Sequence, residues 1–233
     1  MRNPNIFESL GLLKEFEVPI GSVLDVGIQH STPVLMRLFP DLHHHLFEPV
    51  QEYYPKIKAN YAEIDHTLVE VAVSDVAAEL NLHTQKKTRG DEISHSFLVD
   101  KEDDSTRKIR SITLDEYCQT CPEQGPFLLK IDVEGADVPT RILRGARRSL
   151  AQTSVVAIEM TVDKFMERAI VLHEAGFDLW DLCDLCYYGR CLWQADAVFV
   201  RRDIKGSIPQ LSPMHQPPFD PAEWQSGLWN NNL

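Results

Sequence analysis

Polar side chains, most of them acidic, stand at the ends of the strands that this sequence predicts. In an open α/β sheet, ligands bind beyond the carboxyl ends of the strands, so we expect these side chains to gather in one crevice. Carboxylates in such a crevice can bind hydroxyls, face a cationic ligand or accept a proton. The residues concerned are Asp25 and Gly27, Glu48, Ser74 and Asp75, Asp132 and Glu134, and Glu159.

The loop after the first predicted strand distinguishes between nucleotide cofactors. A dinucleotide site needs Gly-x-Gly-x-x-Gly, with a carboxylate about 20 residues further on for the ribose. Glu48 follows Gly27 by 21 residues, but the second and third glycine positions are Gln29 and His30 or its neighbours, none of which is glycine. Asp25 would also direct negative charge at a pyrophosphate. A ligand with a ribose, a cationic end and no pyrophosphate fits better, and S-adenosylmethionine is such a ligand.

These residues have distinct expected roles toward S-adenosylmethionine. Asp25 is expected to face its ammonium-bearing end, Gly27 to give clearance, and Glu48 to accept both ribose hydroxyls. The further cofactor contacts are expected from Ile28, Gln29, Ser74, Asp75 and Asp132.

Asp132, Glu134 and Glu159 are the candidates for catalysis. Methyl transfer from a sulfonium is an in-line displacement in which the protein mainly positions the nucleophile, and a hydroxyl acceptor needs a proton acceptor nearby. Asp132 and Glu134 are two apart at a strand end, so an extended backbone puts them on one side, and Glu159 ends the adjacent strand. We expect one of the three to be the base; the alternative is that together they hold Mg²⁺. His30 and His95 are further base candidates.

Cysteine and histidine pairs raise the question of a zinc site. Cys118/Cys121 and Cys183/Cys186 are Cys-x-x-Cys pairs, but the predicted topology puts them at opposite edges of the sheet. A strand separates those edges by ~17–20 Å, which is too far for one ion. The run His43–His45 enters a strand, and alternation splits its side chains between two faces. No metal site is therefore predicted at these cysteines or histidines.

Short β-branched strands alternate with helical patterns along the chain, which implies a parallel, doubly wound sheet. The segment 86–104 is polar and is predicted to be a loop. Asp137 can cap a helix whose apolar stripe recurs every four residues. The expected strands are 22–26, 45–48, 67–73, 80–83, 109–114, 127–132, 155–159, 177–182 and 197–201, and the expected helices are 33–39, 50–61, 138–150 and 163–175.

Composition and charge limit the classes of function. The 233 residues carry a net charge of −12, which disfavours nucleic-acid binding because that needs clustered Lys and Arg. No apolar run reaches the ~18 residues of a membrane span, no secretory signal is recognised, and five cysteines do not form a disulfide framework. We therefore expect a cytoplasmic protein with one folded domain at 1–203 and a Pro-rich tail at 204–233. Trp224 and Trp229 are possible anchors of the tail, and an ordered and a disordered tail are both open.

Several of these segments together resemble the motifs of the FkbM-type methyltransferases, over roughly residues 20–202. The resemblance implies a class I methyltransferase fold, with a seven-stranded, mostly parallel sheet and an antiparallel last strand, that moves a methyl group from S-adenosylmethionine to a hydroxyl oxygen. The first loop departs from the family pattern, because Ile28 and Ser31 replace an alanine and a glycine. The matching segments are Val23-Leu-Asp-Val-Gly27, Leu46-Phe-Glu-Pro49, Ile112-Thr-Leu-Asp115, Leu129-Lys-Ile-Asp-Val-Glu-Gly-Ala136, Arg144-Gly-Ala146, Val156-Ala-Ile-Glu159 and Gln194-Ala-Asp-Ala-Val-Phe-Val200.

Three functions follow as hypotheses. The leading one is an O-methyltransferase that acts on a hydroxyl of a small molecule, sugar or glycan. The alternatives are a catalytically silent binding or scaffold domain and a nicotinamide-dependent oxidoreductase, against which the missing glycines argue. The acceptor and the oligomeric state do not follow from the sequence.

Overall fold

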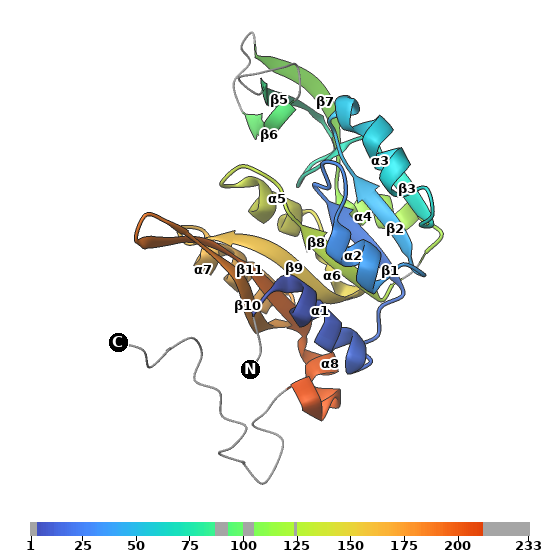
Figure 1. Cartoon of the computed structure of the whole chain (residues 1–233), viewed down its shortest axis with the longest axis vertical. Coiled ribbons are helices and arrows are strands. Elements are labelled where there is room, and N and C mark those ends of the chain that lie inside the picture. Colours follow the sequence, from blue (N-terminus) through green and yellow to red (C-terminus); the bar gives the residue numbers. More distant parts are fainter. Residues whose placement is uncertain (1–3, 87–92, 100–104, 124, 212–233) are drawn as a thin grey trace.

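A seven-stranded mixed sheet forms the centre of the molecule (Figure 1). The computed structural model describes residues 4–86, 93–99, 105–123 and 125–211. The sheet has the strand order β10-β11-β9-β8-β1-β2-β3; its part from β9 to β3 is parallel, and β11, the last strand of the chain, is antiparallel to β9 and β10. The predicted fold class is confirmed. The strands are β1 (Ser22–Val26), β2 (His43–Phe47), β3 (His66–Val69), β8 (Phe127–Ile131), β9 (Thr153–Thr161), β10 (Phe177–Tyr188) and β11 (Cys191–Arg201).

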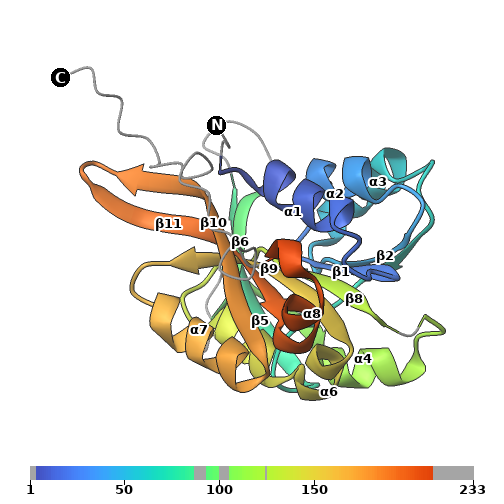
Figure 2. The same ribbon diagram turned by 90° about the horizontal axis from the view of Figure 1, so that it is seen from below.

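Helices cover both faces of this sheet (Figure 2). Successive strand residues point to opposite faces, so Val23 and Leu128 pack with residues of α1 and α2, whereas Leu24 and Leu129 pack with residues of α4 to α7. The first face carries α1 (Ile6–Glu15), α2 (Pro33–Leu38), α3 (Tyr54–Asn60, after the 3₁₀ turn Gln51–Tyr53) and α8 (Arg202–Ser207); the second carries α4 (Leu114–Thr120), α5 (Val138–Arg144), α6 (Arg147–Ala151) and α7 (Phe165–Glu174).

A second, four-stranded sheet is inserted between β3 and α4, with the order β4-β7-β5-β6. The predicted third strand over 67–73 is wrong in its second half, because the chain leaves the main sheet after Val69 and β4 pairs with β7 instead. The predicted loop over 86–104 is wrong at 93–99, where β6 pairs with β5 and Ile93 is buried. The strands are β4 (Ala72–Val73), β5 (Glu79–Lys86), β6 (Ile93–Val99) and β7 (Thr106–Ile112).

The helix predicted over 138–150 is two helices, α5 and α6, separated at Gly145. A Cβ atom on Gly145 would lie 2.4 Å from the Ser74 carbonyl oxygen, so this glycine lets the turn after β4 pack tightly against the helices. The predicted apolar stripe is nevertheless buried. It consists of Val138, Ile142, Ala146 and Leu150.

The C-terminal part of the described chain is more extensive than predicted. Strands β10 and β11 form a long hairpin that projects beyond the helices (Figure 2). After β11, Ile204 in α8 and Leu211 in the 3₁₀ turn Pro209–Leu211 are buried, so the packed domain continues past residue 203. Trp224 and Trp229 lie outside the described residues. No helix in the described ranges is long and apolar enough to cross a bilayer.

Candidate functional site

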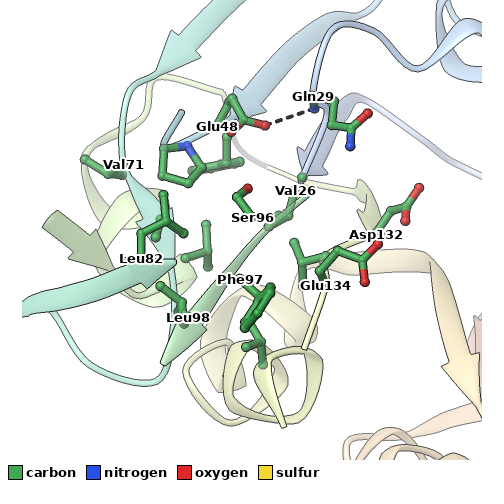
Figure 3. A pocket seen from close by; sticks show the side chains of 17 residues that line it. Val26, Gln29, Glu48, Val71, Leu82, Ser96, Phe97, Leu98, Asp132 and Glu134 are labelled. Carbon is green, nitrogen blue, oxygen red and sulfur yellow. Dashed lines mark hydrogen bonds between the residues drawn. The ribbon is translucent and has the colours of Figure 1, made fainter. Parts of the chain in front are cut away.

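A cavity lies at the carboxyl ends of β1, β2 and β8 (Figure 3). The second sheet closes the cavity with apolar side chains, among them Val73, Leu82 and Leu98. The polar side chains that line it include Gln29, Glu48, Asp132 and Glu134.

The loop after β1 is held against the loop after β8. Gly27 has a φ of +88°, and its amide donates to the Phe47 carbonyl at 3.1 Å. A Cβ atom on Gly27 would lie 2.1 Å from the Asp132 carbonyl oxygen and 2.6 Å from a Val133 methyl group. The sequence argument assigned Gly27 to ligand clearance, whereas the structure shows that the chain's own backbone already requires a glycine here.

Glu48 lies at the cavity wall, directly after β2, and is 3% exposed. Its Oε2 accepts from the Gln29 amide at 2.9 Å (Figure 3). Its Oε1 accepts from the Val50 amide, also at 2.9 Å. Burial raises the pKa of Glu48 to about 7, although the two amide bonds and Arg107 lower it. Each carboxylate oxygen can accept more than one hydrogen bond, so both can still accept from a ribose.

Asp25 does not line the cavity. Its side chain is fully buried and interacts with Thr32 and Lys130. Burial raises the pKa of Asp25 to about 6, although Lys130 lowers it. Neither of its buried carboxylate oxygens has a hydrogen-bond partner by distance and angle within the described part of the chain, and its expected contact with an ammonium group stays a prediction.

Three other predicted cofactor contacts also lie away from the cavity lining. Ile28 packs in a hydrophobic cluster with residues of α3. Ser74 donates to Asp75 at 3.0 Å, and Asp75 pairs with Arg141 at 2.8 Å. The physical reason is that these two residues follow β4 of the second sheet and not β3, so they do not come to the ligand-binding edge of the main sheet.

The three predicted catalytic acids come close enough to interact. Asp132 and Glu134 line the cavity side by side (Figure 3). Burial, and after it the neighbouring charges of Asp132 and Glu134, raise the pKa of Glu159 to about 7. Gln194 donates to Glu159 at 2.6 Å. The three carboxyl groups thus form one electrostatic group, in which Asp132 and Glu134 line the cavity and Glu159 lies outside its lining.

Two further charged residues in this group were missed from the sequence. Lys130 pairs with Asp132 at 2.7 Å; burial lowers the pKa of Lys130, but the nearby carboxylates outweigh this and raise it. Burial also raises the pKa of Asp196 to about 6. The sequence did contain a signal for Lys130, because it is a lysine inside the apolar run Phe127–Ile131. A buried cation requires a nearby anion, so its pairing with an acidic residue could have been predicted.

The second sheet also reaches the catalytic acids. Phe97 in β6 forms an isolated parallel bridge with Glu134, and Ser96, Phe97 and Leu98 line the cavity. No sequence argument placed these residues at the site, although the apolar run Phe97–Val99 inside a polar segment was a possible signal. The side chain of His95 lies outside the described part of the chain, and His30 stacks on Tyr53 with ring centres 4.6 Å apart.

The strand order and the position of the cavity are those of the class I S-adenosylmethionine-dependent methyltransferases. An rRNA methylase from Streptococcus thermophilus is similar in structure with a TM-score of 0.50 and 13% identity, over 86% of this chain and 98% of that one. A putative tRNA (m1A22) methyltransferase from Streptococcus pneumoniae, in complex with S-adenosyl-L-methionine, gives a TM-score of 0.47 and 14% identity, over 89% and 83% of the two chains. At such identities the likeness concerns the fold alone.

Residues 25–179, about two thirds of the chain, match the family model of the methyltransferase FkbM domain. The chain belongs to this family. It is therefore an S-adenosylmethionine-dependent methyltransferase, as predicted, and the nicotinamide-dependent alternative is not supported. No curated protein is significantly similar to this chain.

Proposed function

We propose that this methyltransferase acts on a hydroxyl oxygen of a small molecule or sugar. The observation that carries the proposal is Glu159, whose pKa of about 7 results from burial and from the acidic neighbours Asp132 and Glu134. A hydroxyl acceptor must lose a proton when its oxygen is methylated, and a base with a pKa near the working pH accepts that proton best.

The cavity residues fit S-adenosylmethionine by their chemistry. When bound, the cofactor supplies the methyl group that is transferred. Glu48 offers two carboxylate oxygens to the ribose hydroxyls, and the apolar side chains of Val73 and Leu82 suit the adenine. Asp132 and Glu134, rather than the buried Asp25, are the carboxylates that can face the cationic end.

The acidic residues of this group then have two different roles. Asp132, paired with Lys130, positions the acceptor and the cationic end of the cofactor by charge. Glu159, oriented by Gln194, takes the hydroxyl proton. Phe97, bridged to Glu134, helps to exclude water from the reacting groups.

A small acceptor suits the charge of this protein better than a nucleic acid. Although the two structures named above are described as RNA methyltransferases, Lys130 at this site is surrounded by acidic residues, and the net charge is −12. A phosphate backbone would be repelled. The cytoplasmic location, the lack of a membrane partner and the oligomeric state stay untested.

Acceptors that differ only in the nucleophile test the proposal. We would incubate the protein with S-adenosylmethionine and matched sets of a sugar, its amino-sugar and its thio-sugar, and measure released S-adenosylhomocysteine. Turnover with hydroxyl acceptors that rises with pH through about 7 supports the assignment. Turnover with amino acceptors alone would contradict it.

The role of Asp132 can be separated from metal binding by one substitution. Asp132→Ala should reduce turnover more than it changes Tm, because relief of repulsion among the carboxylates offsets the lost ion pair with Lys130. The measurement compares Tm and specific activity of both proteins with and without EDTA. We expect EDTA to leave the wild-type rate unchanged; a loss of activity that Mg²⁺ restores would instead support the metal alternative. A large loss of Tm with normal activity would make Asp132 structural.

A further inference from the structure

The other end of β2 carries a second group of ligating side chains. His43 and His45 alternate with His44, so they share the face of the sheet that packs against α4. Glu123 reaches the same place from the connection between α4 and β8. One ligating atom from each of His43, His45 and Glu123 lies within 4.8 Å of the others. The sequence argument disfavoured a metal here because it considered the histidine run alone.

The distance between His45 and Glu123 is that of two ligands on one ion. His45 Nε2 lies 3.6 Å from Glu123 Oε2, which is too long for a good hydrogen bond. Two donors with bonds of ~2.0–2.2 Å to a tetrahedral ion are separated by roughly 3.3–3.6 Å. The spacing therefore leaves room for an ion between these two atoms.

Both atoms are buried, and neither has a hydrogen-bond partner within the described residues. His45 is 1% exposed, and its Nδ1 is already bonded to the Tyr117 hydroxyl at 2.8 Å, so Nε2 is the nitrogen left to bind. Leaving buried polar atoms without partners is costly. A cation between Nε2 and Oε2 would satisfy both.

His43 is oriented as metal-binding histidines are. Its Nδ1 contacts Asp65 Oδ2 and its Nε2 contacts the Thr67 hydroxyl, both at 2.9 Å. A carboxylate on one ring nitrogen is the usual support for a histidine whose other nitrogen binds a metal. The Thr67 hydroxyl is a neutral partner that an ion can replace.

We propose that His43, His45 and Glu123 bind a divalent transition-metal ion, with Zn²⁺ as the best-suited ion. Two imidazoles and one carboxylate suit zinc, whereas Mg²⁺ and Ca²⁺ prefer oxygen ligands throughout. The site lies at the amino end of β2 and the cavity lies beyond its carboxyl end, so the ion takes no part in methyl transfer. It ties the α4–β8 connection to β2 and stabilises the folded state, because binding to the folded chain alone raises its stability.

Metal titration of matched variants tests this site. We would prepare metal-free protein in a Cys186→Ser/Cys191→Ser background, because these exposed thiols could bind zinc on their own. Zn²⁺ is then titrated by calorimetry, and Tm is measured with and without Zn²⁺. We expect one Zn²⁺ per chain and a rise in Tm of about 5 °C or more when Zn²⁺ is well above its Kd.

The test variants are Glu123→Gln and His43→Gln, which keep nearly the size of the original side chains. Each should weaken Zn²⁺ binding at least about tenfold and abolish the rise in Tm. Glu63→Gln, on the exposed surface, is the matched control and should bind as the parent does. His45→Gln is less suitable because His45 is buried and its loss could unfold the chain. No binding by the parent protein, or equal affinity in the parent, Glu123→Gln and His43→Gln, would overturn the proposal.

Discussion

The two ends of strand β2 hold their charged groups in different ways. Beyond the carboxyl end, Glu48 is held by two backbone amides, and its carboxylate faces a cavity. At the amino end, His45 is buried against Tyr117, and its Nε2 lies 3.6 Å from Glu123 Oε2. Backbone amides orient a carboxylate without occupying all of its acceptor capacity. The carboxyl end of β2 can therefore bind a ligand reversibly.

This difference predicts where substitutions act. Changes beyond the carboxyl ends of the strands should alter cofactor binding and turnover more than stability. Changes at the amino end of β2 should alter stability and leave methyl transfer intact. Each of the following experiments either strengthens this difference between the two ends of β2 or contradicts it.

The largest effect is expected at Glu159. Glu159→Gln keeps the shape of the side chain and its neighbour Gln194 but removes the proton acceptor, so turnover should fall roughly 10²–10⁴-fold. The affinity for S-adenosylmethionine, measured by calorimetry, should stay within a few-fold of that of the wild type. The wild-type rate should rise with pH through about 7, and the remaining rate of the variant should lose this dependence. A variant that retains full turnover would assign the proton transfer to another group.

Gly27 should give the next largest effect. Gly27→Val places a Cβ atom at a φ of +88° and 2.1 Å from the Asp132 carbonyl oxygen, so the loops after β1 and β8 must separate and cofactor affinity should fall at least about tenfold. Gly176→Val is the matched control, because Gly176 has a φ of +92° and no atom within 4 Å of its Cβ position. Both variants carry the same backbone strain, and only Gly27→Val carries the collision. Equal loss of Tm in the two variants, with cofactor affinity unchanged, would show that the loop contact is unimportant.

Glu48 should give a smaller change, mainly in cofactor binding. Glu48→Ala should weaken S-adenosylmethionine binding at least about tenfold, since two ribose hydroxyls lose a charged acceptor. It also removes the acceptor of the Gln29 amide and of the buried Val50 amide, so some loss of Tm is expected. Glu48→Gln retains one acceptor oxygen and should bind weakly with a smaller loss of Tm. Unchanged affinity in both variants would remove Glu48 from the site.

The cofactor half of the site was more predictable from the sequence than the acceptor half. Gly27 and Glu48 come from short parallel strands, whose period and end signals are local, and their spacing of 21 residues is visible in the sequence. Ser74 and Asp75 were misplaced because the choice of partner strand for residues 72–73 depends on β7, far along the chain. The contribution of β6 was hidden for the same reason: its pairing with β5, and not its polar composition, makes it a strand.

Long-range contacts also explain why acids with similar sequence signals have different roles. Asp115, which belongs to one of the family-like segments, accepts from the Arg148 and Ser149 amides at the start of α6, so it serves the fold. Asp196 was not distinguished from other polar strand residues, yet it faces Lys130 across the sheet. Strand order decides both cases, and strand order is not a local property of the sequence.

The smallest expected effect is on the pH dependence of stability, which should have opposite signs at the two ends of β2. Glu48 has its pKa raised to about 7 by burial, so the folded state binds more protons than the unfolded chain between pH ~4.5 and ~7, and this end loses stability as pH rises through that window. His45 has its pKa lowered to about 4 by burial and by His43. The unfolded chain then binds more protons between pH ~4 and ~6.5, and the amino end gains stability as pH rises.

Glu48→Gln separates these two contributions. The substitution removes the carboxyl group that titrates at the cavity and leaves His45 in place, so the variant's Tm should gain relative to that of the wild type as pH rises from 5 to 8. The gain should be a few degrees, because about 1 kcal/mol shifts Tm by roughly 2–4 °C in a chain of this size. The measurement is a set of melting curves at low ionic strength without cofactor, with Glu63→Gln as the control because that carboxyl group is exposed. Parallel curves for Glu48→Gln and the wild type would mean that the charge at Glu48 is compensated in the folded state. The charge at the cavity end of β2 would then be balanced within the folded chain.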